Sequence, residues 1–484
     1  MGTRNSRLAS AIMALSFGIG TVAALAETPA AQPSGQEDLR AEVQELKAQV
    51  QDLQKKDKDT QGDIAATIKQ VLADADAHSD AVTAGYANKR FFIKSEDGNF
   101  LFQPWIHIQT RYSTAFRDDA KGGNTAEDIQ SGFELRRARF GFDGNIFSPD
   151  VSYFINWATY RENSQVKVTD SAGDTSTANV PIGGLPVLEE AWGRFRFHDT
   201  PYYIRVGQIH DPLDHENIIG SKYRDPEASL QGDIFGNTDT FTQGATFIYD
   251  PKESLRVEGG ATDGIRAANT NFQDYPTTGI NYDGGVAARV EYKVEGNWGD
   301  YNQFSALNDT KELMVLGAGA DYSYGGDFNT LSHTADIQYD SPNGLSAYAA
   351  YFGRYTEHNP GIPSGAPVST SFASGSPQTG QDTYEPSVMV QAGYLIDGKI
   401  EPYVRYEYMH LQGTAIPSGF TFVQNNVSEI SIGAHYYLSG NNVKFTVQGM
   451  YLPTGIPIGD DSSDVLISNN RSEIVIITQV QLLI

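Results

Sequence analysis

Arginines that recur between aromatic and aliphatic residues are the side chains in this sequence best suited to do chemistry. In segments such as FELRRARFGF (residues 133–142), two-residue alternation places several of them on one face. A guanidinium group stays charged at any working pH and offers planar, bidentate donors to phosphate or carboxylate oxygens. A column of such groups would give a moving anion several weak sites in succession, as conduction requires. The arginines that we assign to a pore-lining, anion-binding face are Arg111, Arg137, Arg139, Arg194, Arg196, Arg205 and Arg256.

The same arginines have a second interpretation, as structural supports. Pairing with Glu190, Glu258 and acidic loop residues would let them hold a lumen together and leave a transverse field that screens solutes without binding them. These arginines all lie in the first half of the chain's predicted strands, whereas the later strands carry basic and acidic residues together. The basic residues would therefore gather on one wall. The sequence leaves both interpretations open.

A long polar segment, GQIHDPLDHENIIGSKYRDPEASLQGDIF (residues 207–235), is the second candidate region. We expect it to fold into a lumen as a constriction loop. Its cluster HDPLDHE has metal-ligand residue types, but polar loops collect such residues by chance, and we expect neither a metal nor a cofactor. The constriction-loop candidates are His210, Asp211, His215, Lys222 and Arg224.

Motifs of known enzyme classes are missing from the sequence. It contains no GxSxG, no HExxH and no Gly-Lys-Ser/Thr phosphate loop. We therefore expect no catalytic residues and a protein that is not an enzyme.

The N-terminus and the composition limit the class of protein. Residues 1–26 have a basic tip, an apolar run and a small-residue end, Ala24-Leu25-Ala26, which predicts a signal peptide. The chain has no cysteine, 39% hydrophobic residues and no later apolar run of helix-spanning length, so it is either soluble or a barrel. Its 48 Gly, 26 Tyr and 24 Phe favour many short twisted strands with aromatic rims. A formal charge of -25 argues against a nucleic-acid partner.

A heptad pattern follows a linker at residues 27–35. Within residues 36–57 the apolar positions are Leu39, Val43, Leu46, Val50 and Leu53, which predict a coiled coil with Val at a and Leu at d. A single amphipathic helix lying on its own domain is the alternative. Residues 58–91, rich in Ala and Asp, are either helical or a flexible tether.

From about Phe92 the period changes to two, which indicates strands. The predicted strands lie near 98–113, 132–144, 150–160, 188–198, 201–208, 240–249, 254–262, 285–294, 312–322, 330–340, 344–356, 385–396, 399–410, 427–438, 442–452 and 472–484. Sixteen is an even number within the range of outer-membrane barrels. The connections alternate between long polar loops and short turns, as in such barrels, except near residues 295–311 and 323–329. A secreted β-sandwich is the disfavoured alternative.

The segment FELRRARFGF poses a problem of register. Uniform alternation cannot place Phe133, Leu135, Phe140 and Phe142 on one face. One extra residue at Arg136, a β-bulge, would turn all four outward and direct Arg137 and Arg139 into the pore.

Several segments together resemble the phosphate-selective porin O and P family. They include FELRRARFGFDGNIFSPDVSYFINWA, LEEAWGRFRF, YYIRVGQIHDPLDHEN and GYLIDGKIEPYVRYEYM, within residues 95–484. The resemblance implies a trimer of 16-stranded outer-membrane barrels with an arginine ladder and lysines that attract phosphate or polyphosphate. By motif, Arg136, Arg137, Arg139 and Arg205 carry over. The sequence departs from the family where His210 replaces a lysine and Leu213 an aromatic residue, in its acidic loops, and in ending on Ile484 rather than Phe.

The sequence therefore predicts an all-β fold, a 16-stranded antiparallel transmembrane β-barrel preceded by a short α-helical coiled coil. We expect an outer-membrane porin of a Gram-negative-type bacterium, homotrimeric, in contact with lipid, with its coiled coil in the periplasm. Small hydrophilic, anionic solutes such as phosphate would diffuse through it. Alternatives are a general or cation-preferring porin, or a plugged barrel that serves as a structural or adhesive surface anchor.

Overall fold

The computed structural model describes most of the chain from residue 82 onward and a few residues before it. The described residues are 44–49, 51–52, 69, 82–87, 90–117, 129–159, 163–169, 175–181, 186–224, 229–236, 241–265, 267, 269, 282–307, 309–325, 328–358, 382–411, 426–456, 465 and 472–484, with only the backbone for 163–169 and 175–181. The chain divides into two compact units, residues 1–78 and 79–484. The predicted signal peptide and linker lie outside the described residues.

In the first unit, helix is described at residues 44–49 and 51–52, inside the segment predicted to be a coiled coil. Leu46, a predicted seam residue, is 54% exposed, as expected of a seam without its partner chain. Assembly of this helix with other copies remains a prediction. In the part of the chain that the structure describes, no helix is long and apolar enough to cross a membrane.

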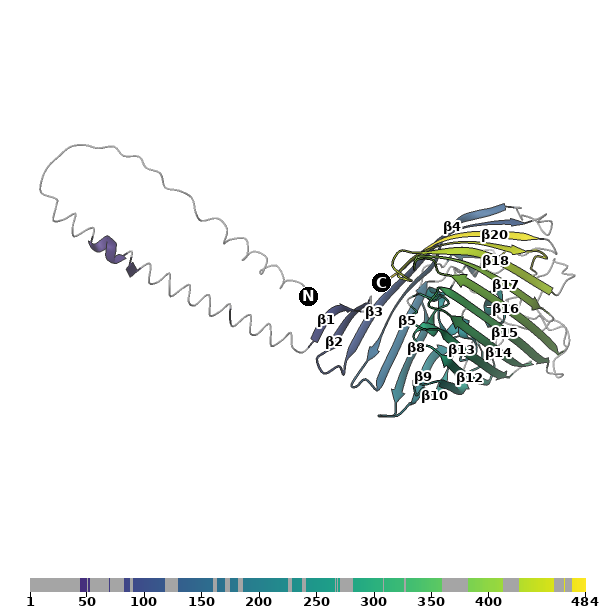
Figure 1. Cartoon of the computed structure of the whole chain (residues 1–484), viewed down its shortest axis with the longest axis horizontal. Helices are drawn as coiled ribbons and strands as arrows, with labels where there is room; N and C mark the ends of the chain where they lie inside the picture. Colours follow the sequence, from purple (N-terminus) through teal and green to yellow (C-terminus); the bar gives the residue numbers. More distant parts are fainter. Residues whose placement is uncertain are drawn as a thin grey trace, which may run out of the picture. The chain divides into compact units, whose positions relative to one another are not determined.

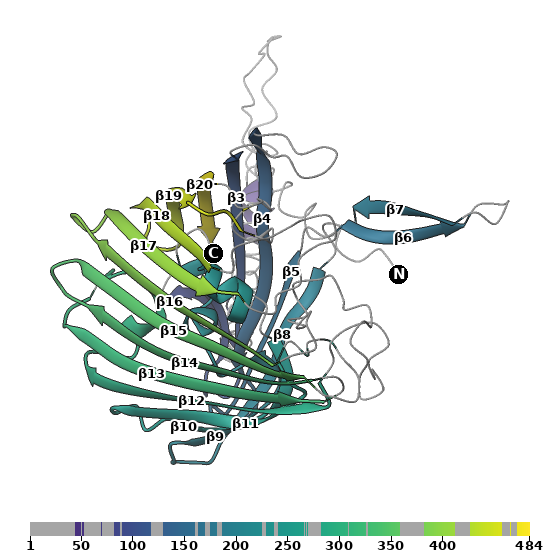
Figure 2. The same ribbon diagram turned by 90° about the vertical axis from the view of Figure 1, so that its right-hand side faces the viewer.

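The second unit is built on a closed barrel of sixteen antiparallel strands (Figures 1 and 2). Each strand pairs with the next strand along the barrel, and β20 pairs with β3 to close the ring. The strands are β3 (Leu101–Arg117), β4 (Ile129–Asn145), β5 (Val151–Thr159), β8 (Pro186–Arg196), β9 (Tyr202–His210), β10 (Phe241–Tyr249), β11 (Leu255–Thr262), β12 (Gly284–Glu295), β13 (Leu313–Tyr324), β14 (Phe328–Asp340), β15 (Leu345–His358), β16 (Thr383–Tyr394), β17 (Ile400–His410), β18 (Asn426–Tyr437), β19 (Val443–Leu452) and β20 (Glu473–Leu483). All sixteen coincide with predicted strands, so the all-β barrel prediction is confirmed.

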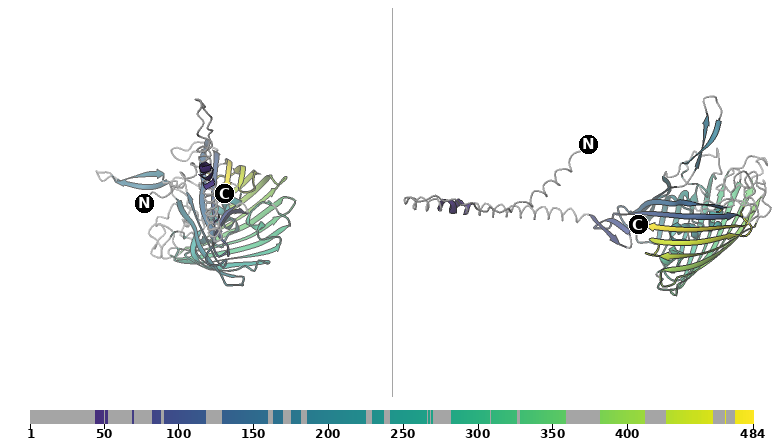
Figure 3. Two further views of the ribbon diagram at one scale, coloured as in Figure 1. Left: turned by 90° about the vertical axis from the view of Figure 1, so that its left-hand side faces the viewer. Right: turned by 90° about the horizontal axis from the view of Figure 1, so that it is seen from above.

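Two hairpins stand outside the barrel ring. Strands β1 (Val82–Ala87) and β2 (Arg90–Ser95) pair with each other, and β2 adds two residue pairs to β3, beginning at Ile93 and Phe102. The predicted tether, residues 58–91, therefore ends in strand, which its short and Ala/Gly-rich pattern did not reveal. Strands β6 (Asn163–Thr169) and β7 (Thr175–Pro181) form a second hairpin in a connection predicted only as a long polar loop, and they project away from the barrel wall (Figure 3).

Side chains alternate between an apolar outer face and a polar inner face. In β20, Ile474 and Ile476 are 44% and 43% exposed, whereas Gln479 and Gln481 are 3% and 0% exposed. An apolar outer surface is unfavourable in water and favourable against lipid hydrocarbon. The alternation thus defines a lipid-compatible exterior and a polar lumen.

The strand bounds confirm the predicted alternation of long loops and short turns, with the two exceptions near residues 295–311 and 323–329. The 296–312 connection belongs to the short-turn end but carries the 3₁₀ helix η3 (Asp300–Asn302). Trp298, just before η3, and Tyr301 within it pack against Leu313 and Val315. Only three residues, 325–327, separate β13 from β14 at the opposite end. Both departures are therefore real features of the chain rather than errors of strand assignment.

The predicted bulge at Arg136 is confirmed. In the pairing of β3 with β4, Gln109 faces Arg137 and Thr110 faces Leu135, so Arg136 has no partner in the register. Phe133 and Leu135 are 82% and 53% exposed on the outer face, while Arg137 is only 4% exposed. The extra residue thus reconciles the two halves of the strand.

Candidate functional site

The described parts of the connection between β9 and β10, residues 211–224 and 229–236, lie inside the barrel. It contains α2 (His215–Ile218), the 3₁₀ helix η1 (Ser221–Tyr223) and the π-helix η2 (Gly232–Gly236). Its backbone is bonded to inward side chains of many strands: Thr334 Oγ1 donates to Leu213 O (2.7 Å), and Lys444 Nζ donates to Arg224 O (2.7 Å). The carboxylate of Glu407 accepts from the backbone N–H groups of Leu230 and Gln231 at 3.1 and 2.8 Å. This segment, residues 211–236, is named the lumen loop below.

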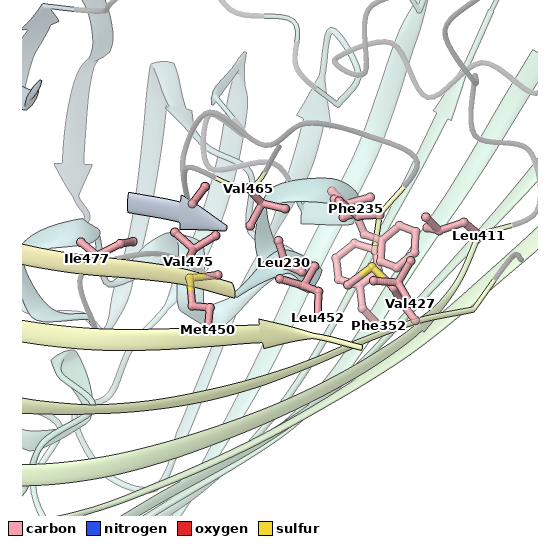
Figure 4. Packing of buried hydrophobic residues seen from close by; sticks show 14 of the residues in the cluster. Leu230, Phe235, Phe352, Leu411, Val427, Met450, Leu452, Val465, Val475 and Ile477 are labelled. Carbon is pink, nitrogen blue, oxygen red and sulfur yellow. The ribbon is translucent and has the colours of Figure 1, made fainter. Parts of the chain in front are cut away.

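Apolar packing fixes the second half of the lumen loop to one side of the barrel. Leu230, Ile234 and Phe235 of this half, and Leu213 at the start of the loop, share a buried cluster with residues of β15 and β17 to β20. Figure 4 shows Leu230 and Phe235 within it. The ring of Phe235 stacks on that of Phe352, with centroids 5.7 Å apart. Burial of these side chains stabilises the loop position by the hydrophobic effect, about 1.5–3 kcal/mol for each large side chain. The loop is therefore a packed part of the barrel interior.

Most of the predicted pore-lining arginines have carboxylate partners. Arg139 donates to Glu189 through Nη2 (2.6 Å) and Nε (3.0 Å), and Arg256 Nε lies 3.2 Å from Asp250 Oδ1. Arg196 Nη1 is 3.8 Å from Asp150 Oδ1 in an exposed pair. Further ion pairs join Arg111 to Glu134 and Arg205 to Glu258. These contacts correspond to the supporting role that the sequence left open.

Arg137 and Arg194 have different surroundings. Arg137 Nη1 donates to Gln109 Oε1 (2.9 Å), and its guanidinium group interacts electrostatically with Arg111, Arg139 and Arg224. Arg194 Nε donates to Ser152 Oγ (3.1 Å). Among the residues described, no carboxylate lies within 4 Å of the Arg194 guanidinium group. Its charge is therefore less compensated than that of Arg205 or Arg256.

On the lumen loop, Lys222 is the cation that faces open space. Its Nζ lies 4.9 Å from the ring centroid of Trp105 and 5.3 Å from that of Tyr223. Within the described residues no carboxylate approaches it within 4 Å. It lines a cavity of about 380 Å³ together with Arg90, Trp105 and Tyr223. Burial, with Arg90 as a second cause, lowers the pKa of Lys222 to about 8.

The other loop candidates are buried and engaged. The His210 ring packs on Phe241 (4.4 Å between centroids), and that of His215 on Tyr301 (3.7 Å). Burial lowers the pKa of His215 to about 4, so this imidazole is neutral at pH 7. Arg224 Nη1 lies 3.9 Å from Glu216 Oε1. His215 and Arg224 thus act as packing and bonding groups of the lumen loop, and His210 packs at the end of β9.

Two buried acids of the lumen loop hold protons more strongly than usual. Burial raises the pKa of Asp211 well above its ordinary value, with nearby Asp321 adding to the shift. Burial and then Glu216 raise the pKa of Asp214 to about 7. Below pH 7 the carboxyl group of Asp214 is mostly neutral. In the part of the chain that is described, no group of three or more His, Asp or Glu residues converges as a metal site.

Sequence reasoning missed two features of this lumen. Glu189 is a second bulge residue, opposite Asn156 and Trp157 of β5, and its buried carboxylate binds both Arg139 and Asn156. Trp105, Phe154 and Trp192 place aromatic rings on the polar face of their strands. An aromatic residue at a polar position of the alternation was the signal that would have found them.

Comparison with solved structures shows a fold similar to that of one anion-selective porin. An anion-selective porin from Comamonas acidovorans has a TM-score of 0.50 at 10% identity, covering 79% of this chain and 99% of that one. OmpF of Salmonella typhi in complex with daunomycin has a TM-score of 0.49 at 13% identity, covering 79% and 98%. A trimer form of OmpT, an outer-membrane protein of Vibrio cholerae, has a TM-score of 0.45 at 10% identity, covering 78% and 99%. At such identities the likeness concerns the fold alone.

Sequence comparison gives one family. No curated protein sequence matches this chain. The matched family and the barrel fold are those of channel proteins and not of enzymes. Residues 106–329 match the model of the family described as phosphate-selective porin O and P, which confirms the resemblance seen in the sequence.

Proposed function

We propose that this protein is an outer-membrane porin through which small hydrophilic anions, phosphate among them, diffuse. The observation that carries the proposal is Lys222, a cation on the lumen loop that lines a cavity. In the described part of the chain no carboxylate lies within 4 Å of its Nζ. The family match and the anion-selective porin of similar fold support the same reading.

Charge pairing explains why a few groups decide the selectivity. The carboxylates of Glu134, Glu189 and Glu258 are held by arginines, and paired charges attract mobile ions only weakly. On the opposite wall, Arg289 with Asp336 and Arg354 with Glu385 form similar pairs. We therefore assign the anion preference mainly to the positive charges of Lys222 and Arg194. The carboxyl group of Asp214 on the lumen loop is mostly neutral below pH 7.

The attachment of the lumen loop supports one position for the solute path. Its hydrophobic cluster and most of its backbone contacts face β12 and β14 to β20, through residues such as Thr334, Glu407 and Lys444. On the opposite side, Arg139 reaches Ser221, and Lys222 lies over Trp105. We place the solute path between the lumen loop and the β3–β9 wall, where the lining is polar and basic.

The departures from the family motif do not remove this basic lining. His210 and Leu213, which replace a lysine and an aromatic residue, are engaged in packing with Phe241 and with the apolar cluster. Lys222 supplies a cation further along the same loop. We further propose a homotrimer that contacts outer-membrane lipid through its apolar exterior, with the predicted coiled coil in the periplasm.

The test is the ion selectivity of the purified protein in planar bilayers across a salt gradient. Replacement of Lys222 by Gln should lower the anion-to-cation permeability ratio by about two- to fivefold, because a unit charge about 4–8 Å away in water is worth about 0.5–1 kcal/mol. The matched control is Lys399→Gln, the same charge change in an exposed turn, which should leave the ratio unchanged. Unchanged selectivity in Lys222→Gln contradicts the proposal. A closed barrel without conductance favours the anchor alternative instead.

A further inference from the structure

Three aromatic rings from neighbouring strands form a stack on the lumen wall. The centroids of Trp105 (β3) and Phe154 (β5) lie 6.1 Å apart with planes at 30°, and those of Phe154 and Trp192 (β8) lie 5.6 Å apart at 13°. Phe154 and Trp192 are partners in the β5–β8 register, so their side chains emerge on the same face. That face is the lumen, because Ser152 and Arg194 are register partners on it as well. These three residues are named the ring stack below.

Cations lie at both ends of the ring stack. At one end is Lys222, 4.9 Å from the Trp105 centroid. At the other, the Arg194 guanidinium carbon is 5.8 Å from the centroid of Trp192 and 5.2 Å from that of Tyr203, and Arg205 is 5.6 Å from Trp192. Within the described ranges, neither Lys222 nor Arg194 has a carboxylate within 4 Å of its charged group. The wall thus combines a continuous aromatic surface with a positive charge at each end.

The cavity beside Lys222 exposes this surface to a solute. Its volume of about 380 Å³ falls within the range of small-molecule pockets, about 300–1,000 Å³. Trp105 and Phe154 line it, so the first part of the ring stack borders open space. A single-ring molecule fits such a volume.

The polar groups around the cavity narrow the class of solute. Asn441 Nδ2 donates to Gln303 Oε1 (3.1 Å), Asn442 Nδ2 donates to Leu483 O (2.8 Å), and Arg90 is paired with Asp143. Each of these groups already has a partner within the protein, so together they offer a hydroxyl-rich sugar fewer hydrogen bonds than unengaged groups would. The Lys222 ammonium group remains available, and it attracts a negative charge next to a flat apolar surface.

We propose that the ring stack is a recognition track for aromatic carboxylates, which bind with the carboxylate at Lys222 or Arg194 and the ring against the aromatic wall. This inference rests on the proposed anion-conducting function and names a solute class for the same lumen. Aromatic rings prefer offset-stacked and edge-to-face contacts with one another, and the wall offers successive sites of this kind. Weak sites in series permit passage rather than capture.

The test compares two carboxylates of equal charge and similar size, benzoate and cyclohexanecarboxylate. The chloride current of the full-length protein in a planar bilayer is titrated with each at constant ionic strength. We expect half-block at a benzoate concentration about two- to tenfold lower than that of cyclohexanecarboxylate, the ratio expected for one ring–ring contact. Equal half-block concentrations, in a protein that still conducts chloride selectively, overturn this inference and leave the porin function intact. A cation-selective or silent protein instead counts against the proposed function itself.

Variants separate the ring stack from the charges. Phe154→Leu removes the central ring and keeps an apolar side chain, so it should abolish the difference between the two carboxylates while chloride selectivity persists. Phe140→Leu is the matched control, because Phe140 is 43% exposed on the outer face and should leave the difference unchanged. Trp192→Leu at the other end of the ring stack should also abolish the difference. If both lumen variants fold and keep the preference for benzoate, the ring stack is not the recognition site.

Discussion

Loss of the Arg139 side chain tests most sharply whether the pore-wall arginines are supports or solute sites. Arg139 makes two donor contacts with Glu189, at 2.6 and 3.0 Å, and the side chains are 14% and 1% exposed. Removing one partner of a buried pair costs about 3–5 kcal/mol, because the other charge stays buried without compensation. Asn156 still donates to Glu189 (2.6 Å), so we expect about 3 kcal/mol for Arg139→Gln.

A double replacement provides the control for this prediction. In Arg139→Gln with Glu189→Gln no charge is left buried, and the double variant should recover most of the lost free energy of unfolding. Urea unfolding in lipid vesicles, followed by tryptophan fluorescence, measures both values. A loss below about 1 kcal/mol in the single variant, together with a fall in anion selectivity, would refute the assignment of Arg139 as a support.

Three further predictions address register, charge and packing. Deletion of Arg136 should reverse the faces of the residues of β4 before it, so that Phe133 points toward the lumen and the barrel does not fold. Loss of the heat-modifiable band on gels measures this, and Arg136→Gly, which keeps the bulge, should still fold. Anion selectivity should fall as pH rises from 6 to 9, because Asp214 (pKa about 7) gains a negative charge and Lys222 (pKa about 8) loses its positive charge. Reversal potentials measure this fall. In Lys222→Gln only the change near pH 7 should remain. Phe352→Ala opens a cavity beneath the lumen loop and should lower the free energy of unfolding by about 3–5 kcal/mol in urea titrations, with no loss expected if the loop does not pack there.

The strands were predictable because burial on one face enforces a period of two. The bulge at Arg136 was also predictable, because the apolar residues before and after it can share one face only if the alternation shifts by one residue. Strands β1 and β2 were not predicted, because VTAGYA and RFFIKS are short and border an Ala-rich segment with no clear period. The backbone of β6 and β7 pairs within a polar loop, where alternation carries no signal.

The sequence indicated Glu258 as an acidic partner, but it could not predict which arginine each acid would meet. Arg205 and Glu258 are 53 residues apart and lie on strands separated by β10, so their contact depends on the register of two successive strand pairs. The bulge at Glu189 changes which acid meets Arg139. Assigning the basic residues to the correct face of each strand therefore did not distinguish the paired arginines from Arg194. It also did not reveal that Lys222 lies over Trp105.

The reversal potential of the unmodified protein in a potassium chloride gradient at neutral pH tests the central claim most directly. An anion-conducting lumen governed by Lys222 and Arg194 predicts a potential of the sign set by chloride, and its magnitude should decrease when phosphate competes for the same path. A potential of the sign set by potassium would contradict the account.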